Sequence, residues 1–157
     1  MEYLEIPLLD EDGNEVKLKD FLGRWIVLYI YPRDNTPGCT TEAKEFTELL
    51  PEFEKFGVLV VGVSKDSIES HRRFKEKHNL KVKLLSDPEA KLIKTLGAWS
   101  KKMRGEGVLR STFIINPKGE IVWEKRRVKA KGHAAKVIEV IRKLVGNEGN
   151  NPNSIKT

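Results

Sequence analysis

The sequence predicts a single α/β domain in which a central mixed sheet is flanked by helices. Two continuous apolar runs of strand length, Trp25–Tyr31 (WIVLYIY) and Val58–Val63 (VLVVGV), are typical of strands that are covered on both faces. Segments with apolar residues at three- and four-residue spacing follow both runs and predict helices. The chain has 157 residues, of which 39% are hydrophobic and 33% charged, so it is long enough to bury one core.

The N-terminal half begins with a predicted hairpin. Asp12-Gly13-Asn14 is a turn sequence that lies between Tyr3–Leu9 and Glu15–Leu18. The first central strand follows, and Pro32 ends it because proline has no N–H to donate to a sheet. We expect the next helix over residues 40–56.

Pro51 lies inside that first helical pattern and predicts a kink or a break, since proline removes a helical hydrogen bond. After the second central strand, Ser67–His78 is expected to form a helix that Ser64 or Asp66 caps. A short strand over Lys83–Leu85 follows. The next helix should open at Asp87-Pro88, with proline in its first position, and run to about Leu96.

A second hairpin and a closing helix complete the predicted domain, residues 1–145. Thr112–Asn116 and Glu120–Lys125 flank a Pro-Lys-Gly turn, and His133–Val145 is amphipathic. Residues 146–157 are polar and rich in Asn and Gly, which indicates a flexible tail. A βαβ unit followed by a β-hairpin and a closing helix is the thioredoxin-like plan, so we expect a thioredoxin-like fold.

Composition argues against two classes of partner. Lys and Arg number 29 and Asp and Glu number 23, but the densest basic cluster, residues 125–131, contains no aromatic residue that could stack on bases. We interpret it as a solvated surface and expect no nucleic-acid partner. No apolar run approaches the roughly 18 residues of a membrane helix. The acidic N-terminus lacks the pattern of a signal peptide, so a cytoplasmic location is expected.

The chain contains no Gln and is rich in Lys and Glu, which resembles proteins of thermophiles. Its single cysteine, Cys39, excludes a disulfide within the chain and a zinc site made of cysteines alone. His71, His78 and His133 share no ligand spacing, so surface or core positions are favoured over a metal site. We expect no metal and no other cofactor.

Cys39 is either a small buried apolar residue, as lone cysteines usually are, or a reactive thiol. It follows a central strand and stands at the start of a helix, where unpaired N–H groups and the helix dipole favour a thiolate. Thr36 is close enough in sequence for its hydroxyl to bond the sulfur or a bound oxygen, and Gly38 lets the backbone approach a ligand closely. Pro32 stiffens the loop. In the place of the Cys-x-x-Cys of thioredoxins, residues 36–39 read Thr-Pro-Gly-Cys, so dithiol exchange within one chain is impossible.

The spacing Pro32-x-x-x-Thr36-x-x-Cys39 matches the signature of peroxiredoxins. The run YPRDNTPGCTTEAKEF, and LGAWSKKMRGEGVLRSTFIINPKGEI from Leu96 onward, closely resemble the bacterioferritin-comigratory (Q-type) subfamily. The resemblance covers roughly residues 3–145. It implies a thiol peroxidase that reduces hydrogen peroxide and organic hydroperoxides without metal, haem or flavin.

The resemblance also implies roles for single residues. Cys39 matches the peroxidatic cysteine, which becomes a sulfenic acid, and Thr36 the hydroxyl that bonds sulfur and peroxide. Pro32 matches the residue that shields the site from water. Arg110, in VLRSTF, matches the arginine that activates the thiol and binds peroxide, and it directly precedes a predicted strand. Glu42 matches a glutamate that we expect to orient this arginine.

One departure changes the expected cycle. Many Q-type members carry a resolving cysteine five residues after the first, and here that position is Lys44, which we interpret as a solvated helix residue. An external thiol (thioredoxin, glutaredoxin or a small thiol) must then reduce the sulfenic acid, which is more exposed to overoxidation. The resemblance allows a monomer or a weak homodimer.

Two further possibilities stay open at this point. A redox sensor or interaction module with a thioredoxin-like fold would use the same cysteine without rapid turnover. Trp99 and Met103, in the second matching run, either line the pocket or pack in the core, since both residue types usually serve cores.

Overall fold

The computed structural model describes residues 1–102 and 105–150. Seven strands form one mixed sheet in the order β2-β1-β5-β4-β3-β8-β9. Its centre consists of β3 (Trp25–Ile30), β4 (Val58–Ser64) and β5 (Lys83–Ser86), which run parallel. The apolar runs of the sequence therefore form the buried middle of the sheet, and the α/β prediction is confirmed.

Antiparallel hairpins extend the sheet on both sides. On one side β1 (Leu8–Leu9) pairs with both β2 (Glu15–Val16) and β5. On the other, β8 (Ser111–Ile115) pairs with β3 and with β9 (Ile121–Arg126). Both predicted hairpins are confirmed, but the first is shorter than expected. Two 3-10 helices occupy the rest of its expected length: Glu2–Leu4 and Leu18–Phe21.

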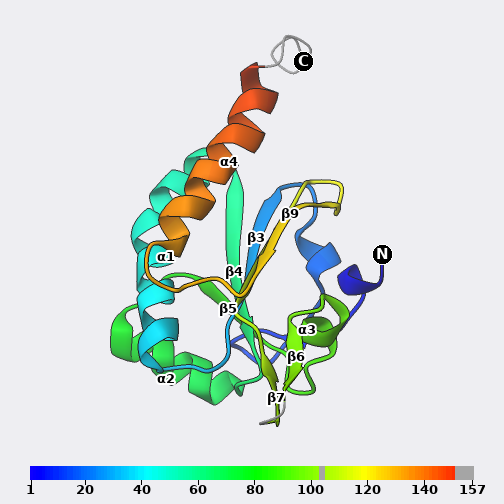
Figure 1. Ribbon diagram of the computed structural model, residues 1–157. Helices are drawn as coiled ribbons and strands as arrows, with labels where there is room; N and C mark the ends of the chain where they lie inside the picture. The colour runs from blue at the N-terminus through cyan, green and yellow to red at the C-terminus, as the bar shows by residue number, and fades with distance from the viewer. Residues whose placement is uncertain (103–104, 151–157) are drawn as a thin grey trace.

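Helices cover the two faces of the sheet unequally (Figure 1). The long helices α1 (Pro37–Lys55) and α4 (His133–Asn150) lie side by side on one face, together with α2 (Ile68–His78). The short helix α3 (Lys91–Thr95) lies over the other face, with the N-terminal 3-10 helix. Each face thus has its own apolar core, and Cys39 belongs to the core under α1.

The predicted helix over Ser67–His78 is confirmed, but its predicted cap and the predicted start of the next helix are wrong. Ser67, not Ser64 or Asp66, caps α2, because its side chain accepts the Ser70 N–H at 3.2 Å. Ser64 instead donates to the Asp66 carboxylate at 2.7 Å. Helix α3 begins only at Lys91, so proline does not occupy its first position.

The first helix starts three residues earlier than predicted, at Pro37, with proline in the first turn. Cys39 is therefore inside this first turn and not just before it. Pro51 does not break the helix, which continues to Lys55. Packing of α1 against α4 and the sheet outweighs the hydrogen bond that Pro51 removes.

Two features of the C-terminal half were not predicted. A separate hairpin, β6 (Trp99–Lys102) and β7 (Gly105–Val108), stands apart from the main sheet. Its glycines and lysines hide the alternation that marks a strand. Helix α4 runs to Asn150, past the expected domain end at 145. The expected flexible tail falls largely on residues 151–157, which lie outside the described part of the chain. Among the described residues, no helix is long and apolar enough to cross a membrane.

Gly62 of β4 tests how tightly the core under α1 is packed. A Cβ at this position would lie 2.6 Å from Tyr29 Cζ and 2.9 Å from Leu84 Cδ2, and both side chains are buried. Gly62→Ala should therefore lower the free energy of unfolding by about 1–3 kcal/mol. Gly146→Ala, in α4 with open space around it, is the control and should raise stability by about 0.5–1 kcal/mol. Urea unfolding measures both, and equal effects would contradict the packing argument.

Candidate active site

The fold brings Cys39 and Arg110 together although 71 positions separate them in the sequence. Cys39 lies in the first turn of α1, beyond the carboxyl end of β3, where α/β sheets usually place ligands. Arg110 directly precedes β8, and the register pairs Ser111 with Ile30 at that same end of β3. The antiparallel pairing of β8 with β3 therefore delivers Arg110 to the start of α1.

One guanidinium group joins the thiol to a buried carboxylate. Arg110 Nη2 donates to Cys39 Sγ at 3.2 Å, and Arg110 Nη1 donates to Glu42 Oε1 at 2.6 Å. Cys39 and Glu42 are three residues apart and so share one face of α1. The side chain of Arg110 is 15% exposed and that of Glu42 is 0% exposed. The planar fork of arginine can hold both contacts at once, which the single ammonium of lysine cannot.

Burial and charge shift the pKa values of this pair. Burial raises the pKa of Glu42 from 4.5 to about 7, although Arg110 opposes the rise. Burial by itself lowers the pKa of Arg110, but the charges of Glu42 and Cys39 outweigh it and raise the pKa. Arg110 therefore stays charged beside the sulfur at any physiological pH.

The backbone around Arg110 fixes its position. The N–H of Val128 donates to the Arg110 carbonyl at 3.0 Å. A Cβ on Gly38 would lie 3.0 Å from Arg110 Nη2, so this glycine makes room for the guanidinium group. The predicted close approach of Gly38 to a ligand stays a prediction, and its close neighbour within the chain is Arg110.

Thr36 is the residue that precedes α1, but its side chain makes no capping bond. Its hydroxyl donates to the Arg33 carbonyl at 3.0 Å, and within the described residues it makes no bond to the Cys39 sulfur. The oxygen of this hydroxyl still has acceptor capacity. The expected contact from Thr36 to sulfur and peroxide therefore stays a prediction for the peroxide-bound state.

Pro32 and Thr36 line an open pocket of about 400 Å³ together with Trp99 and Val108. Both alternatives hold for Trp99, which lines this pocket and also packs against the apolar core on the α3 side of the sheet. Its indole N–H is buried without a partner among the described residues. Lys94 and Lys65 lie over the Trp99 ring, at 4.7 Å and 5.3 Å from its centroid. The other residue predicted for this pocket, Met103, lies outside the described residues.

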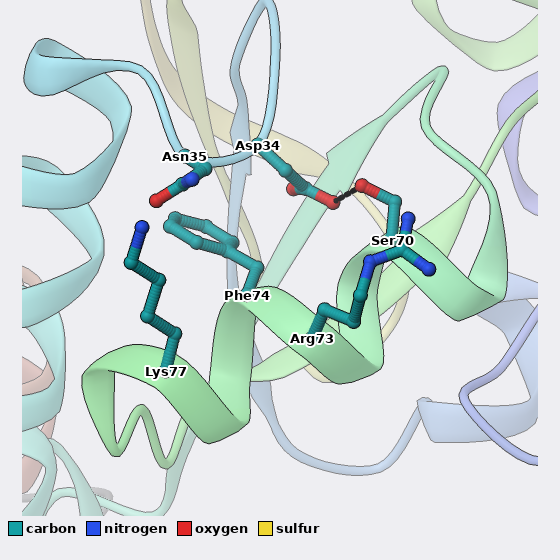
Figure 2. A pocket seen from close by; sticks show the side chains of 6 residues that line it. All are labelled: Asp34, Asn35, Ser70, Arg73, Phe74 and Lys77. Atoms are coloured by element: carbon teal, nitrogen blue, oxygen red, sulfur yellow. Dashed lines mark hydrogen bonds between the residues drawn. The ribbon is translucent and has the colours of Figure 1, made fainter.

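Sequence reasoning missed the network that holds the loop before Cys39. Figure 2 shows Asp34 directed from this loop toward Ser70 on α2, whose hydroxyl donates to the carboxylate at 2.8 Å. The same carboxylate accepts the Tyr31 hydroxyl at 2.6 Å and lies 2.7 Å from His71 Nδ1. The only signal in the sequence was an aspartate in a catalytic loop. A buried partner 37 residues away could not be inferred from it.

The remaining histidines and Lys44 lie away from the sulfur contacts. His71 and His133 are buried, and His78 lies 2.8 Å from the Asn35 side chain. In the part of the chain that the structure describes, no group of three His, Cys, Asp or Glu residues could hold a metal ion. Lys44 is exposed on α1, as the sequence indicated.

The whole chain resembles known proteins. The AhpC/TSA family pattern matches residues 3–124. Peroxiredoxin Bcp of Bacillus subtilis is 43% identical over 144 residues, which cover 89% of this chain and 92% of that protein. A putative peroxiredoxin bcp of Helicobacter pylori is 48% identical over 139 residues, covering 86% and 91% of the two chains. The chain belongs to the AhpC/TSA family of peroxiredoxins.

Solved structures agree with this assignment. The bacterioferritin comigratory protein of Xanthomonas campestris, studied for alkyl peroxide reduction in trapped intermediate and ligand complexes, superposes with a TM-score of 0.88. It is 38% identical, and the match covers 91% of this chain and 94% of that one. A Xylella fastidiosa PrxQ mutant gives a TM-score of 0.87 at 40% identity, covering 91% of each chain. This peroxiredoxin therefore has the thioredoxin-like Q-type fold, and it is a thiol peroxidase.

The buried glutamate of this peroxiredoxin gives a prediction for pH. Glu42→Gln keeps a hydrogen-bond acceptor but removes the charge that holds Arg110. We expect the rate constant for peroxide reduction at pH 8 to fall about tenfold, equivalent to a charge-assisted bond of roughly 1.4 kcal/mol. The wild-type rate should show a rising step near pH 7, where Glu42 ionises, and the variant should lack it.

Ionisation of Glu42, which should raise the rate of peroxide reduction, should lower the free energy of unfolding. Because the pKa of Glu42 is higher in the folded protein than in the unfolded chain, its contribution to the unfolding free energy decreases from about pH 4.5 to 7. Glu42→Gln should remove this decrease. Glu48→Gln, an exposed change on the same helix, is the control. Identical pH profiles for wild type and Glu42→Gln would contradict the role of the glutamate.

Proposed function

We propose that Cys39 is the peroxidatic cysteine of a one-cysteine thiol peroxidase that reduces hydrogen peroxide and organic hydroperoxides. The Cys39 thiolate attacks the nearer peroxide oxygen, and the O–O bond breaks. The sulfur becomes a sulfenic acid, and the leaving oxygen departs as water or alcohol once it is protonated. The observation that carries the proposal is the 3.2 Å contact from Arg110 to Sγ, anchored from behind by Glu42.

The neighbouring residues take distinct parts in this step. Arg110 stabilises the thiolate and then the charge that develops on the leaving oxygen. Thr36 is proposed to turn its hydroxyl from the Arg33 carbonyl to the bound peroxide. Pro32 limits water at the sulfur, and its pocket offers Trp99 and Val108 to the apolar part of an organic hydroperoxide. Glu42 and Gly38 position Arg110 and touch no reacting atom.

Completion of the cycle requires a thiol from outside the chain. The sequence has one cysteine, and the exposed Lys44 occupies the usual resolving position. A first external thiol forms a mixed disulfide with Cys39 and releases water. A second thiol then releases the Cys39 thiolate and forms an external disulfide. A thioredoxin, a glutaredoxin or a small thiol could supply both.

Three further properties belong to the same proposal. Reducing thiols are abundant in the cytoplasm, which makes it the expected location. A monomer or weak homodimer is the expected state. The composition rich in Lys and Glu predicts a thermophilic source, for which a melting temperature above about 90 °C would be the measurement.

Replacement of the sulfur tests the central claim. Cys39→Ser should abolish the consumption of hydrogen peroxide with dithiothreitol, because serine is not ionised at neutral pH. The wild type should consume many equivalents of peroxide per protein molecule, whereas a redox sensor would stop after about one. Lys44→Ser is the matched control on the same helix and should retain activity. Equal rates for wild type and Cys39→Ser would refute the proposal.

A restored resolving cysteine tests whether the first turn of α1 opens. Five residues of helix separate the Cα atoms by roughly 8–9 Å, beyond the reach of a disulfide. In Lys44→Cys, peroxide should still produce an intramolecular disulfide, seen as a loss of 2 Da by intact mass, because the oxidised turn unwinds. Glu48→Cys, nine residues from Cys39 on the same helix, is the control. Retention of two free thiols in Lys44→Cys after peroxide would show that the turn stays closed.

A further inference from the structure

A basic pocket is formed by the end of β9, the loop that follows it and the first turn of α4. The pocket measures about 250 Å³ and is open to solvent on one side. Its cations are exposed, and none forms an ion pair with a carboxylate of the part of the chain that the structure describes. They are Lys125, Arg127, Lys129, Lys131 and Lys136.

The fold separates these cations from the rest of the basic segment. Arg126 points away, toward the carbonyls of Leu96 and Gly97 and the carboxylate of Glu124. Arg127, next to it, has a φ of 59°, a conformation that non-glycine residues seldom adopt. The strained turn at Arg127 therefore directs the chain so that its neighbours line one pocket.

The pocket is built against the active site. Val128, in its lining, donates to the Arg110 carbonyl. Ala130, in the same loop, has its Cβ 3.7 Å from the place where a Cβ of Gly38 would lie. Gly132 N–H donates to Glu45 of α1 at 2.9 Å. The loop is thus held on both Arg110 and α1, next to the turn that carries Cys39.

The buried His133 also lines the pocket, together with Lys125 and Lys136. Burial, followed by the charges of Lys125, Arg110 and Lys136, lowers the pKa of His133 to about 4. The imidazole is therefore neutral at physiological pH, and its Nε2 lies 2.6 Å from the Thr112 hydroxyl. The excess charge of the pocket stays unbalanced and available to an anion.

We propose that this pocket binds the anionic group of a small reducing thiol and directs that thiol to oxidised Cys39. The inference rests on the one-cysteine cycle proposed above and names the class of its reductant: a low-mass thiol that carries a carboxylate or a phosphate. A pocket of about 250 Å³ accommodates one such group, whereas a protein surface would spread over a wider area.

The direction from which a reducing thiol attacks the oxidised sulfur is compatible with one pocket for the peroxide and another for the thiol. In disulfide formation the thiolate attacks sulfur from the side opposite the leaving oxygen, the S–O bond breaks, and the oxygen leaves as water after gaining a proton. The peroxide pocket, with Pro32 and Thr36, and the basic pocket share no lining residue. A peroxide and a thiol can therefore use different approaches to one sulfur once the first turn of α1 opens.

The experiment reverses charge in the pocket and varies charge on the thiol. The variant Lys129→Glu/Lys131→Glu/Lys136→Glu changes exposed side chains only. Its matched control, Arg24→Glu/Lys118→Glu/Lys143→Glu, makes the same change in net charge at three other exposed positions. Stopped-flow kinetics measures the reduction of preformed Cys39 sulfenic acid by mercaptosuccinate (two carboxylates), 2-mercaptoethanol (neutral) and cysteamine (cationic).

In the pocket variant, the rate constant for reduction of the sulfenic acid by mercaptosuccinate should fall at least about fivefold. The rate constant with 2-mercaptoethanol should change by less than twofold, and that with cysteamine should rise. The loss with mercaptosuccinate should shrink at high salt. Three equal changes, or the same selectivity in the control variant, would overturn the proposal. So would a variant that slows reduction by an acidic thioredoxin but not by mercaptosuccinate, which would assign the pocket to a protein.

The first half of the cycle separates this inference from the proposed function. Both variants should form sulfenic acid with hydrogen peroxide at the wild-type rate, because Cys39, Arg110 and Glu42 are untouched. If wild-type protein formed no sulfenic acid, the peroxidase proposal itself would fail. If sulfenic acid formed normally and thiol selectivity did not change, only the pocket proposal would fail.

Discussion

The contact between the Arg110 guanidinium and the Cys39 sulfur is the interaction on which the rest of the site depends. It requires β8 to pair with β3, so that the residue before Ser111 reaches the start of α1. It also requires Gly38, because any side chain there would press on the guanidinium group. Glu42, inside the core, accepts a hydrogen bond from the other side of the guanidinium group and so holds it in place. A surface arginine in solution would lack all three and would sample many positions beside the sulfur.

Burial gives this arrangement its strength and also its main mechanical problem. Cys39 is 1% exposed, so the thiolate and its partners interact in a medium of low dielectric constant. The same burial blocks a reducing thiol from the oxidised sulfur. Phe46 stacks on Tyr29 with ring centroids 4.6 Å apart and anchors α1 below the first turn. This packing holds α1 from Phe46 onward, so the opening proposed above would involve only the turn that begins at Pro37.

The loop before that turn is held from the opposite side. Asp34 bonds Tyr31 on its own chain segment and Ser70 and His71 on α2, so the loop that contains Thr36 is fixed independently of α1. The loop between β9 and α4, held on Arg110, flanks the same turn. If the first turn opens as proposed above, these two loops would keep the peroxide pocket in place. A basic pocket beside the turn is then well placed to select which thiol enters.

The sequence by itself determined the chemistry and the layout of the domain. Apolar runs of strand length and helical spacing define the sheet and its long helices, because burial imposes those periods locally. The spacing from Pro32 to Cys39 and the absence of a second cysteine predict the peroxidase site and its dependence on an outside thiol. Only the tertiary structure decided what surrounds the sulfur. The contacts of Asp34 with α2, and of Gly132 with Glu45 on α1, join residues that are distant in sequence. Local patterns carry no information about such pairs, because strand pairing and helix packing bring them together only in the folded chain.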